Sequence, residues 1–595
     1  MREGSRVGGA VAAHPPMASW LFPIAVLVGC STLVTTVQAQ DLNSPPFDDL
    51  RRLVDQQQQQ IRQMQDQLAR LQQAAPSQSI PSEQASTSEA GFMLPSDPVK
   101  KPDDGKTAKP ADQPYVVGSD LSVKSDFRNG LFLWFATPNN DFNMHIGGWT
   151  QFDNVWWNES PALKAAPGAR PGHVPQGVAN GAALGGIGDL QDGEYFRRIR
   201  LFFEGNFWGN GEYRIIPAFE NDQFSTVGLD EFWFGATSLP VVGTVHIGHV
   251  KNAIGLEGDM SSSSRCMTFM ERSAYSEAIE LNQNFVTGIQ LSDNYLDQRV
   301  SWQAVAFRPD NGSSSGVFFG DGQGGVQARL TALPVYENEG RDLVHFGISG
   351  GFRDGTTNNA TSPFHVFQLR ARPELRDDDP AAGGPAAVPN ADSNRLIDTG
   401  PITAHDEFLL GLENLWIRGP FSFQAEYGWN FLNGAVGANP GLTAPFFHPA
   451  ITPSQNYVFS GGYLQVAYTL TGENRSYDRR YGALDRYYYG KAGPYSNAWV
   501  IRDEDGNLHC GCGAWEVAAR YSYVNLNDGT GLNRIQGGIL NGVSLALNWY
   551  ANDNFNVMLD WVYDQRDDTP TGPTLATSSP AGWTSGVGIE AQFQF

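Results

Sequence analysis

The chain has 595 residues, of which 17% are charged and 12% aromatic, and its formal net charge is -23. That acidity disfavours nucleic acid as a partner, because neutralising phosphates requires clustered Lys and Arg. Beyond the first 40 positions no run of about 18 apolar residues occurs, which excludes a membrane-spanning helix, although strands with alternate side chains in lipid remain possible.

Residues 1–39 are predicted to be a secretory signal peptide. Met17 precedes the apolar stretch 21–37, and Val37-Gln38-Ala39 offers small residues for cleavage. Because the stretch before Met17 is long for a signal peptide, Met17 is an alternative start. The residues around Cys30 also resemble a lipoprotein signal, in which Cys30 would be lipidated.

Residues 40–73 are predicted to form a short periplasmic coiled coil, and residues 74–129 a disordered linker. Apolar side chains recur in steps of three and four, and the linker is rich in Pro, Ser, Gln and Lys without periodicity. A short coiled coil is marginal alone, so it would be helped by a trimeric body; a single solvated helix is the alternative. The heptad positions are Phe47, Leu50, Val54, Gln57, Ile61, Met64, Leu68 and Leu71.

Residues 130–595 change to alternating apolar and polar segments separated by Gly, Asn, Asp and Pro. In the stretch 421–431 aromatic and small residues at odd positions oppose Ser422, Gln424, Glu426 and Asn430. About 17 such segments occur, which predicts an even number of strands near 16.

Alternation alone also fits a soluble β-sandwich or a β-solenoid. The segments often exceed the soluble norm of about five or six residues, and aromatic residues gather near their ends, as in the girdles of a membrane barrel. The chain also stops on an apolar strand that ends in Phe595. We therefore predict an all-β fold, a transmembrane antiparallel β-barrel of about 16 strands preceded by the coiled-coil helix.

Several phrases of this region resemble the phosphate-selective porin family (porins O and P) of Gram-negative outer membranes, and they run in family order. The resemblance implies a 16-stranded barrel, usually trimeric, that passes small anions along a ladder of arginines; only the arginine phrase 197–200 matches that ladder. The phrases occupy residues 195–200, 269–273, 419–427, 470–475, 513–522 and 547–550.

Arginines placed inward by alternation could bind anions, because a guanidinium keeps its charge and offers a fixed fork of donors. Pairs such as Arg370 and Arg372 would form rungs about 7 Å apart along one strand. The candidate pore-lining residues are Arg198, Arg200, Arg214, Arg299, Arg329, Arg353, Arg370, Arg372 and Arg520.

The alternative is that these arginines form structural ion pairs with acids that face inward by the same alternation. A lumen of crossed ion pairs would have little selectivity, and the sequence leaves both interpretations open. The acids are Glu204, Glu220, Glu407, Glu413, Glu426, Glu516 and Glu590.

Signals for catalysis or metal binding are weak, and we expect no enzyme, no metal and no cofactor. Gly347 to Gly351 matches the G-x-S-x-G nucleophile motif but lies within an alternating strand. Asp503, Asp505 and Asn507 have the spacing of the first ligands of a calcium-binding loop, but the later ligands of such a loop are missing. Cys510 and Cys512 have no second pair for zinc, so a loop disulfide or free thiols are expected.

The sequence therefore predicts passive diffusion of small hydrophilic solutes, with anions such as phosphate favoured, across the outer membrane of a Gram-negative bacterium. The expected partners are small anionic solutes, outer-membrane lipid, two further copies in a homotrimer and, through the coiled coil, peptidoglycan. The alternatives are a general or sugar-type porin, a plugged structural barrel anchored to peptidoglycan, and an outer-membrane enzyme that uses rim carboxylates.

Overall fold

The computed structural model divides the chain into two compact units, residues 1–88 and 89–595, and all described residues belong to the second. The predicted signal peptide and coiled coil therefore lie outside the described residues. The described residues are 116–128, 132–164, 187, 189–219, 228–258, 266–280, 285–308, 324–355, 365–376, 395–400, 402–435, 454–485, 497–498, 501–502, 507–530, 535–567 and 581–595.

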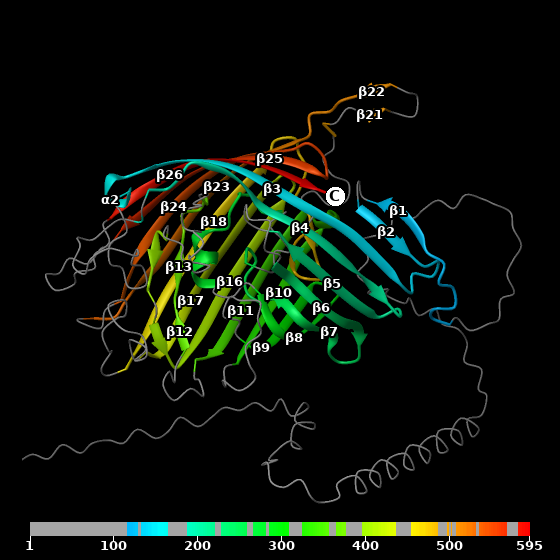
Figure 1. The fold of residues 1–595 in the computed structure, drawn as a ribbon, viewed down its shortest axis with the longest axis horizontal. Helices are drawn as coiled ribbons and strands as arrows, with labels where there is room; N and C mark the ends of the chain where they lie inside the picture. The colour runs from blue at the N-terminus through cyan, green and yellow to red at the C-terminus, as the bar shows by residue number, and fades with distance from the viewer. Residues whose placement is uncertain are drawn as a thin grey trace, which may run out of the picture. The chain divides into compact units, whose positions relative to one another are not determined.

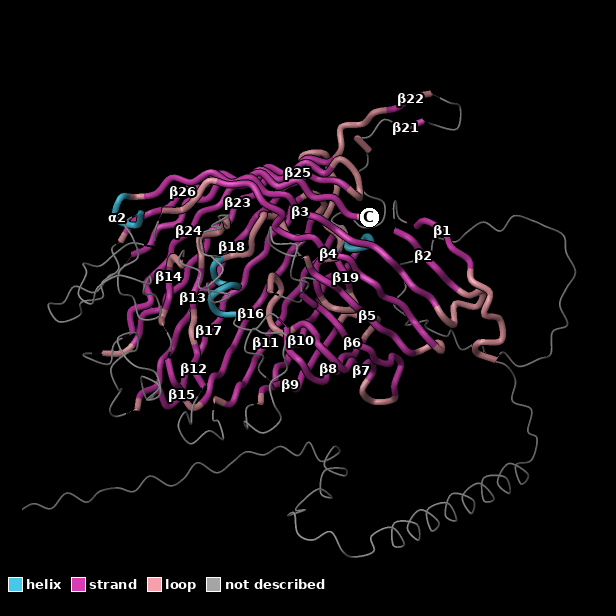
Figure 2. Tube along the Cα trace, in the orientation of Figure 1, coloured by secondary structure: helices cyan, strands magenta, loops and turns pink. Residues whose placement is uncertain are grey.

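Sixteen antiparallel strands pair in chain order, and the last strand pairs with the first to close a barrel (Figures 1 and 2). The predicted fold class and strand number are confirmed. The strands are β3 (Asn143–Glu159), β4 (Gly193–Phe207), β5 (Gly211–Ala218), β6 (Gly228–Leu239), β7 (Gly243–Lys251), β8 (Phe285–Tyr295), β9 (Val300–Arg308), β10 (Gly325–Glu337), β11 (Asp342–Asp354), β16 (Asp406–Arg418), β17 (Phe421–Ala435), β18 (Gln455–Thr469), β23 (Ala514–Asp528), β24 (Ile535–Tyr550), β25 (Phe555–Asp567) and β26 (Gly582–Gln594).

The two faces of the wall have opposite character. On β17 the inward side chains of Gln424, Glu426 and Asn430 are buried, whereas Phe421 and Tyr427 are exposed on the outside. A soluble sheet protein would bury the aromatic side chains and expose the polar ones. The reversed pattern is that of a barrel whose outer face meets lipid. Among the described residues, no helix is long and apolar enough to cross a membrane.

Short turns join the strands at one end of the barrel, and longer connections join them at the other. The turns 208–210, 240–242 and 419–420 belong to the short-turn end, where Gly209 and Gly419 adopt positive φ values of 83° and 55° that glycine adopts readily. Short turns face the periplasm in outer-membrane barrels. The connection 470–513 is a long segment at this same end.

A hairpin of β1 (Lys124–Arg128) and β2 (Phe132–Ala136) precedes the barrel. β2 pairs with the first residues of β3, next to the point where Phe595 pairs with Gly148. β1 lies within the range 74–129 that the sequence predicted to be a disordered linker. That boundary is corrected, because the strand pairing begins at Lys124.

Three segments lie against the inner face of the wall. The lumen loop comprises the described residues 252–258 and 266–280, and it ends in the π-helical turn η2 (Ser276–Glu280). The inserted segment, residues 365–376, 395–400 and 402–404, contains β12 (His365–Phe367), β13 (Arg370–Ala371), β14 (Ile397–Asp398) and β15 (Ile402–Ala404). The periplasmic segment, residues 470–485, contains β19 (Tyr477–Asp478) and β20 (Ala483–Leu484).

The minor elements outside these segments are few. A helix, α2 (Pro161–Lys164), follows β3, and the 3-10 turn η4 (Asn338–Gly340) joins β10 to β11. β21 (Ile501–Arg502) pairs with β22 (Leu508–His509) in the connection that leads to β23.

Replacing Leu412 with Arg should destabilise the barrel in lipid. Leu412 lies midway along β16 and is 45% exposed on the outer face. An arginine on the lipid face near the bilayer midplane costs about 2–4 kcal/mol. The measurement is urea-induced unfolding of the protein refolded into lipid vesicles. The control is Leu508→Arg, outside the sixteen strands, which should leave stability unchanged; equal stability of both variants would contradict the lipid-facing assignment.

Candidate functional site

The lumen loop is fixed to inward polar groups of the wall. The carboxylate of Glu426 on β17 accepts hydrogen bonds from the backbone amides of Leu256 and Glu257, the second at 2.8 Å. In the second described stretch of the loop, residues 266–280, the backbone amide of Met270 donates to the carboxylate of Asp560 on β25 at 2.8 Å. These contacts join residues more than 160 positions apart, and they hold the loop across the wall from β17 to β25.

Within the lumen loop, Glu257 ties the two described stretches together. One of its carboxylate oxygens accepts from the amide of Ser273 at 2.9 Å and from the hydroxyl of Ser276 at 2.9 Å. The other lies 3.1 Å from the guanidinium of Arg520 on β23. The same guanidinium lies 2.8 Å from Glu374 of the inserted segment. Arg520 therefore links the wall, the lumen loop and the inserted segment.

Glu271 of the lumen loop is shared by three arginines from two different parts of the barrel. Arg197 on β4 donates to it directly. Arg198, the next residue, lies 3.8 Å from it, and Arg376 of the inserted segment lies 3.5 Å from it. One carboxylate thus compensates only part of the positive charge gathered around it.

Glu277 is shared in the same way by two arginines of the inserted segment. Arg372 lies 2.5 Å from its carboxylate, and Arg395 also donates to it. We define the arginine cluster as Arg197, Arg198, Arg372, Arg376 and Arg395. Among the described residues, its five guanidinium groups share two carboxylates of the lumen loop.

The wall adds two further acids beside the arginine cluster. Glu590 on β26 pairs in register with Asp153 on β3. Gln151 links Glu590 to Arg198, because its amide donates to Glu590 at 3.0 Å and its carbonyl accepts from Arg198 at 2.8 Å. The cluster therefore lies beside acids of the wall as well as acids of the lumen loop.

The cluster keeps its loop carboxylates ionised. Burial alone would raise the pKa of Glu271, but Arg197, Arg376 and Arg198 together hold it well below the ordinary value of 4.5. Glu277 is half-buried; burial raises its pKa, but Arg395 and Arg372 outweigh this effect and hold the pKa well below 4.5. The pKa of Arg376 is lowered from 12.5 by burial and by the neighbouring guanidinium groups of Arg197 and Arg372. Arginine remains charged at any physiological pH.

The wall arginines outside the cluster form pairs of a different kind. They also face inward, as alternation predicted, but most of them meet acids of the wall itself, which is the arrangement of the structural alternative. The pairs are Arg200 with Asp230 at 2.5 Å, Arg214 with Glu204 at 2.8 Å and with Glu231 at 3.5 Å, Arg329 with Glu413 at 2.6 Å, and Arg353 with Glu407 at 2.7 Å.

Arg329 and Glu413 also hold the periplasmic segment in place. The Arg329 guanidinium donates to the backbone carbonyl groups of Tyr481 and Gly482 at 3.0 and 2.8 Å. His345 lies 2.9 Å from Glu413 and 2.7 Å from the hydroxyl of Tyr477. This network therefore has an anchoring role.

Three predicted arginines lie elsewhere than on a barrel strand. Arg299 is in the turn between β8 and β9 and donates to the carbonyl groups of Leu333 and Tyr336 at 3.4 and 3.2 Å. Arg370 and Arg372 belong to the inserted segment, so the predicted rung along one wall strand is wrong. Alternation over so short a stretch does not distinguish a wall strand from a segment folded inside the barrel.

The sequence prediction missed Arg197, Arg376 and Arg395. Strict alternation turns Arg197 outward, but the register of β3 with β4 shifts between Gln151 and Phe152. This bulge lets Arg197 and Arg198 both reach Glu271. Arg376 and Arg395 belong to the inserted segment, which alternation along the wall strands does not identify. The double arginine at 197–198 was the one available signal of a bulge.

The remaining acids and the weaker motifs are placed as follows. Glu516 accepts a hydrogen bond from Asn548 at 3.2 Å rather than pairing with Arg520, and Glu220 lies outside the described residues. Ser349 of the G-x-S-x-G match lies within β11 and not on a strand-to-helix turn. In the part of the chain that the structure describes, no group of three or more His, Cys, Asp or Glu could hold a metal ion.

The sequence is similar to one family of porins and to two individual proteins. The family model for phosphate-selective porin O and P matches residues 183–595. Porin O of Pseudomonas aeruginosa is 25% identical over 471 residues, which cover 76% of this chain and 88% of that protein. An uncharacterised protein of Caulobacter vibrioides is 24% identical over 427 residues, covering 70% of this chain and 73% of that protein.

Among solved structures, OmpT of Vibrio cholerae has a TM-score of 0.40 at 9% identity and covers 76% of this chain and 98% of that chain. OprB of Pseudomonas putida has a TM-score of 0.37 at 8% identity, with 77% and 95% covered. Similarity at this level supports no further conclusion. The family match spans more than half of the sequence, and the chain therefore belongs to the phosphate-selective porin O and P family of Gram-negative outer-membrane porins.

Proposed function

We propose that this porin passes small anions such as phosphate, and that the arginine cluster is its selective site. The observation that carries the proposal is the sharing of two carboxylates among five guanidinium groups. The printed names of the family and of Porin O agree with an anionic solute. The wall pairs Arg200–Asp230 and Arg353–Glu407 contribute much less, because each charge there has its own partner.

The physical reason lies in the lumen. Low-dielectric walls focus the field of uncompensated charge in a narrow aqueous space. Guanidinium groups bind oxyanions through paired N–H donors. Glu271 and Glu277 hold the arginines in place, and the sharing of each carboxylate among several guanidinium groups favours a solute anion beside them. Conduction also requires that such binding be weak enough to release the ion.

Arg376 is the cluster member best placed to meet a solute. Its side chain is 34% exposed, whereas those of Arg197 and Arg198 are 11% and 3% exposed. The more buried arginines would set the field, and Arg376 would contact the passing anion. The other proposed features, a homotrimer and a peptidoglycan contact through residues 40–73, stay predictions.

Replacing Arg376 with Gln should lower the anion-to-cation permeability ratio. One unit charge about 6 Å from the ion path in a water-like dielectric is worth about 0.7 kcal/mol, which is about a threefold change in local anion concentration. The ratio is measured from the reversal potential of single channels in a planar bilayer under a potassium chloride gradient. Inorganic phosphate should also block the chloride current less in this variant.

The matched control is the double variant Arg200→Gln and Asp230→Asn, which removes a wall pair whose two charges cancel. We expect a smaller change in the permeability ratio for this variant. Equal effects of the two variants would show that the cluster has no special role. An unselective wild-type channel without phosphate block would favour the general porin, and a wild type without conductance steps would favour the plugged barrel.

Anion selectivity should persist on acidification from pH 7 to pH 4. A carboxylate with a depressed pKa stabilises the fold above its unfolded pKa, here near 4.5, and loses that contribution only as the pH falls through its folded value. Glu271 and Glu277 therefore stay ionised and hold their arginines at pH 4. Reversal potentials at the two pH values test this, and a lower anion preference at pH 4 would contradict it.

A further inference from the structure

One row of inward positions on the barrel wall carries no side chains. Gly411 on β16 pairs with Gly428 on β17, and Gly428 pairs with Gly461 on β18. We call these three residues the glycine row. Each glycine within a strand costs roughly 0.5–1 kcal/mol relative to alanine. Three neighbouring glycines therefore point to a close approach by another part of the chain.

Tyr275 of the lumen loop is the group that approaches. A Cβ atom added to Gly428 would lie 2.5 Å from the Tyr275 hydroxyl oxygen and 3.2 Å from its ring. A Cβ on Gly461 would lie 3.3 Å from the ring, and one on Gly411 would lie 3.6 Å from the hydroxyl. Tyr275 is fully buried. The tyrosine thus lies in a shallow seat that exists because the glycine row lacks side chains.

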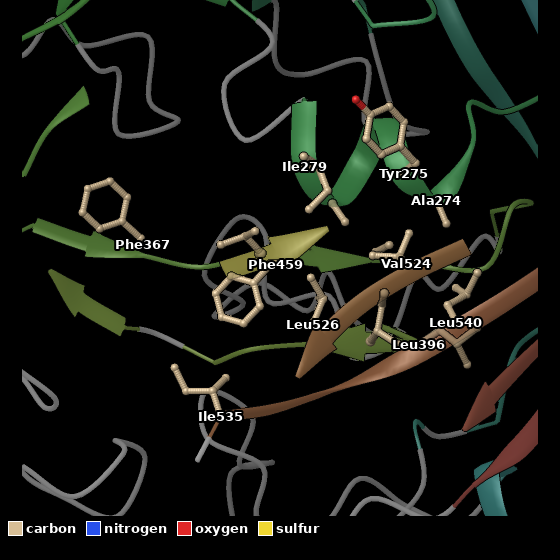
Figure 3. Close-up of a cluster of buried hydrophobic side chains, with 14 of the residues drawn as sticks. Ala274, Tyr275, Ile279, Phe367, Leu396, Phe459, Val524, Leu526, Ile535 and Leu540 are labelled. Carbon is tan, nitrogen blue, oxygen red and sulfur yellow. The ribbon is translucent and has the colours of Figure 1, made fainter. Parts of the chain in front are cut away.

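The seat continues into the packed cluster around η2. Figure 3 shows Ala274, Tyr275 and Ile279 on the helical segment, close to Phe459 of β18 and Val524 of β23. Along the chain Tyr275 stands between Glu271 and Glu277, the two carboxylates of the arginine cluster. A shift of Tyr275 away from the wall would therefore move both carboxylates toward the lumen.

We propose that the glycine row is a seat for Tyr275 that sets how closely the lumen loop lies against the wall, and with it the free cross-section of the pore at the arginine cluster. This inference rests on the proposed function, because it assigns the row to the part of the pore that holds the arginine cluster. The glycines and Tyr275 are positioning residues, which act on the solute through the loop. Any side chain at Gly428 would occupy the space that the tyrosine fills.

The competing explanation is that the glycines serve the strands alone. A Cβ on Gly428 would also lie 2.9 Å from the carbonyl oxygen of Leu410, and one on Gly461 would lie 2.8 Å from that of Tyr523. A variant could therefore act through the backbone of the wall. Removing only the hydroxyl of Tyr275 separates the two explanations. It relieves the contact between that hydroxyl and a Cβ at position 428, but it leaves the contact between the Cβ and the carbonyl oxygen of Leu410.

The test is a double-mutant cycle of Gly428→Ala and Tyr275→Phe in the full-length porin. Its readout is the unit conductance in a planar bilayer, and heat-dependent gel mobility confirms the folded barrel. We expect Gly428→Ala to lower the conductance, Tyr275→Phe to change it little, and the double variant to regain most of the loss. The inference is overturned if Gly428→Ala conducts like the wild type or if the double variant stays as impaired as Gly428→Ala.

The control is Gly350→Ala on β11, whose neighbours Ser349 and Gly351 face inward and whose added Cβ would lie no closer than 3.4 Å to any atom. It should conduct like the wild type. If Gly428→Ala does not fold, Tyr275→Ala empties the seat from the other side and should change the conductance; no change would overturn the inference. Reversal potentials recorded on the same channels keep the proposals apart, because a loss of anion selectivity with an intact conductance pattern would remove the proposed function alone.

Discussion

Every backbone amide and carbonyl group that faces hydrocarbon must be hydrogen-bonded within the protein, and a sheet satisfies this condition only when it closes on itself. The pairing of β26 with β3 is the contact that achieves closure here. Once the sheet is closed, each wall residue faces either lipid or the interior. The outward series must be apolar and the inward series can be polar. This is how a chain with a mean hydropathy of -0.33 can be a membrane protein.

Closure also gathers inward charges in a confined space, where each needs a partner. Most wall arginines outside the cluster are matched by an acid one or two strands away in the wall. The charges of such a pair largely cancel, so the pair attracts a solute only weakly. The arginine cluster differs because its carboxylates come from the lumen loop and are shared. Arg520 also meets acids from outside the wall, Glu257 and Glu374, but there two carboxylates share one guanidinium group. In the cluster, by contrast, each loop carboxylate meets several guanidinium groups.

The alternation of apolar and polar residues predicted the strands of the barrel wall, but it did not predict the segments that fold inside the barrel. It placed Arg198, Arg329 and Arg353 inward, because side-chain direction in a strand depends only on local parity. It failed at Arg197, where a bulge adds a residue and reverses the parity. It placed Arg372 inward but on a wall strand, whereas Arg372 lies inside because a whole segment folds within the barrel. Such positions depend on contacts between residues far apart in sequence.

The lumen loop shows why contacts between residues far apart in sequence are hard to predict. Its anchors, such as Met270 with Asp560 and Leu256 with Glu426, join segments 290 and 170 residues apart. Nothing local distinguishes Glu426 and Asp560 from the inward acids that pair with arginines. The glycine row could not be predicted from the sequence either, because each glycine taken alone indicates only a locally weakened strand. Only when the register brings Gly411, Gly428 and Gly461 side by side do they form a surface with a shape. A loop that folds into a pore needs such a surface on the wall. Where the wall lacks side chains, the loop can lie close against it, and the rest of the lumen stays open for the solute.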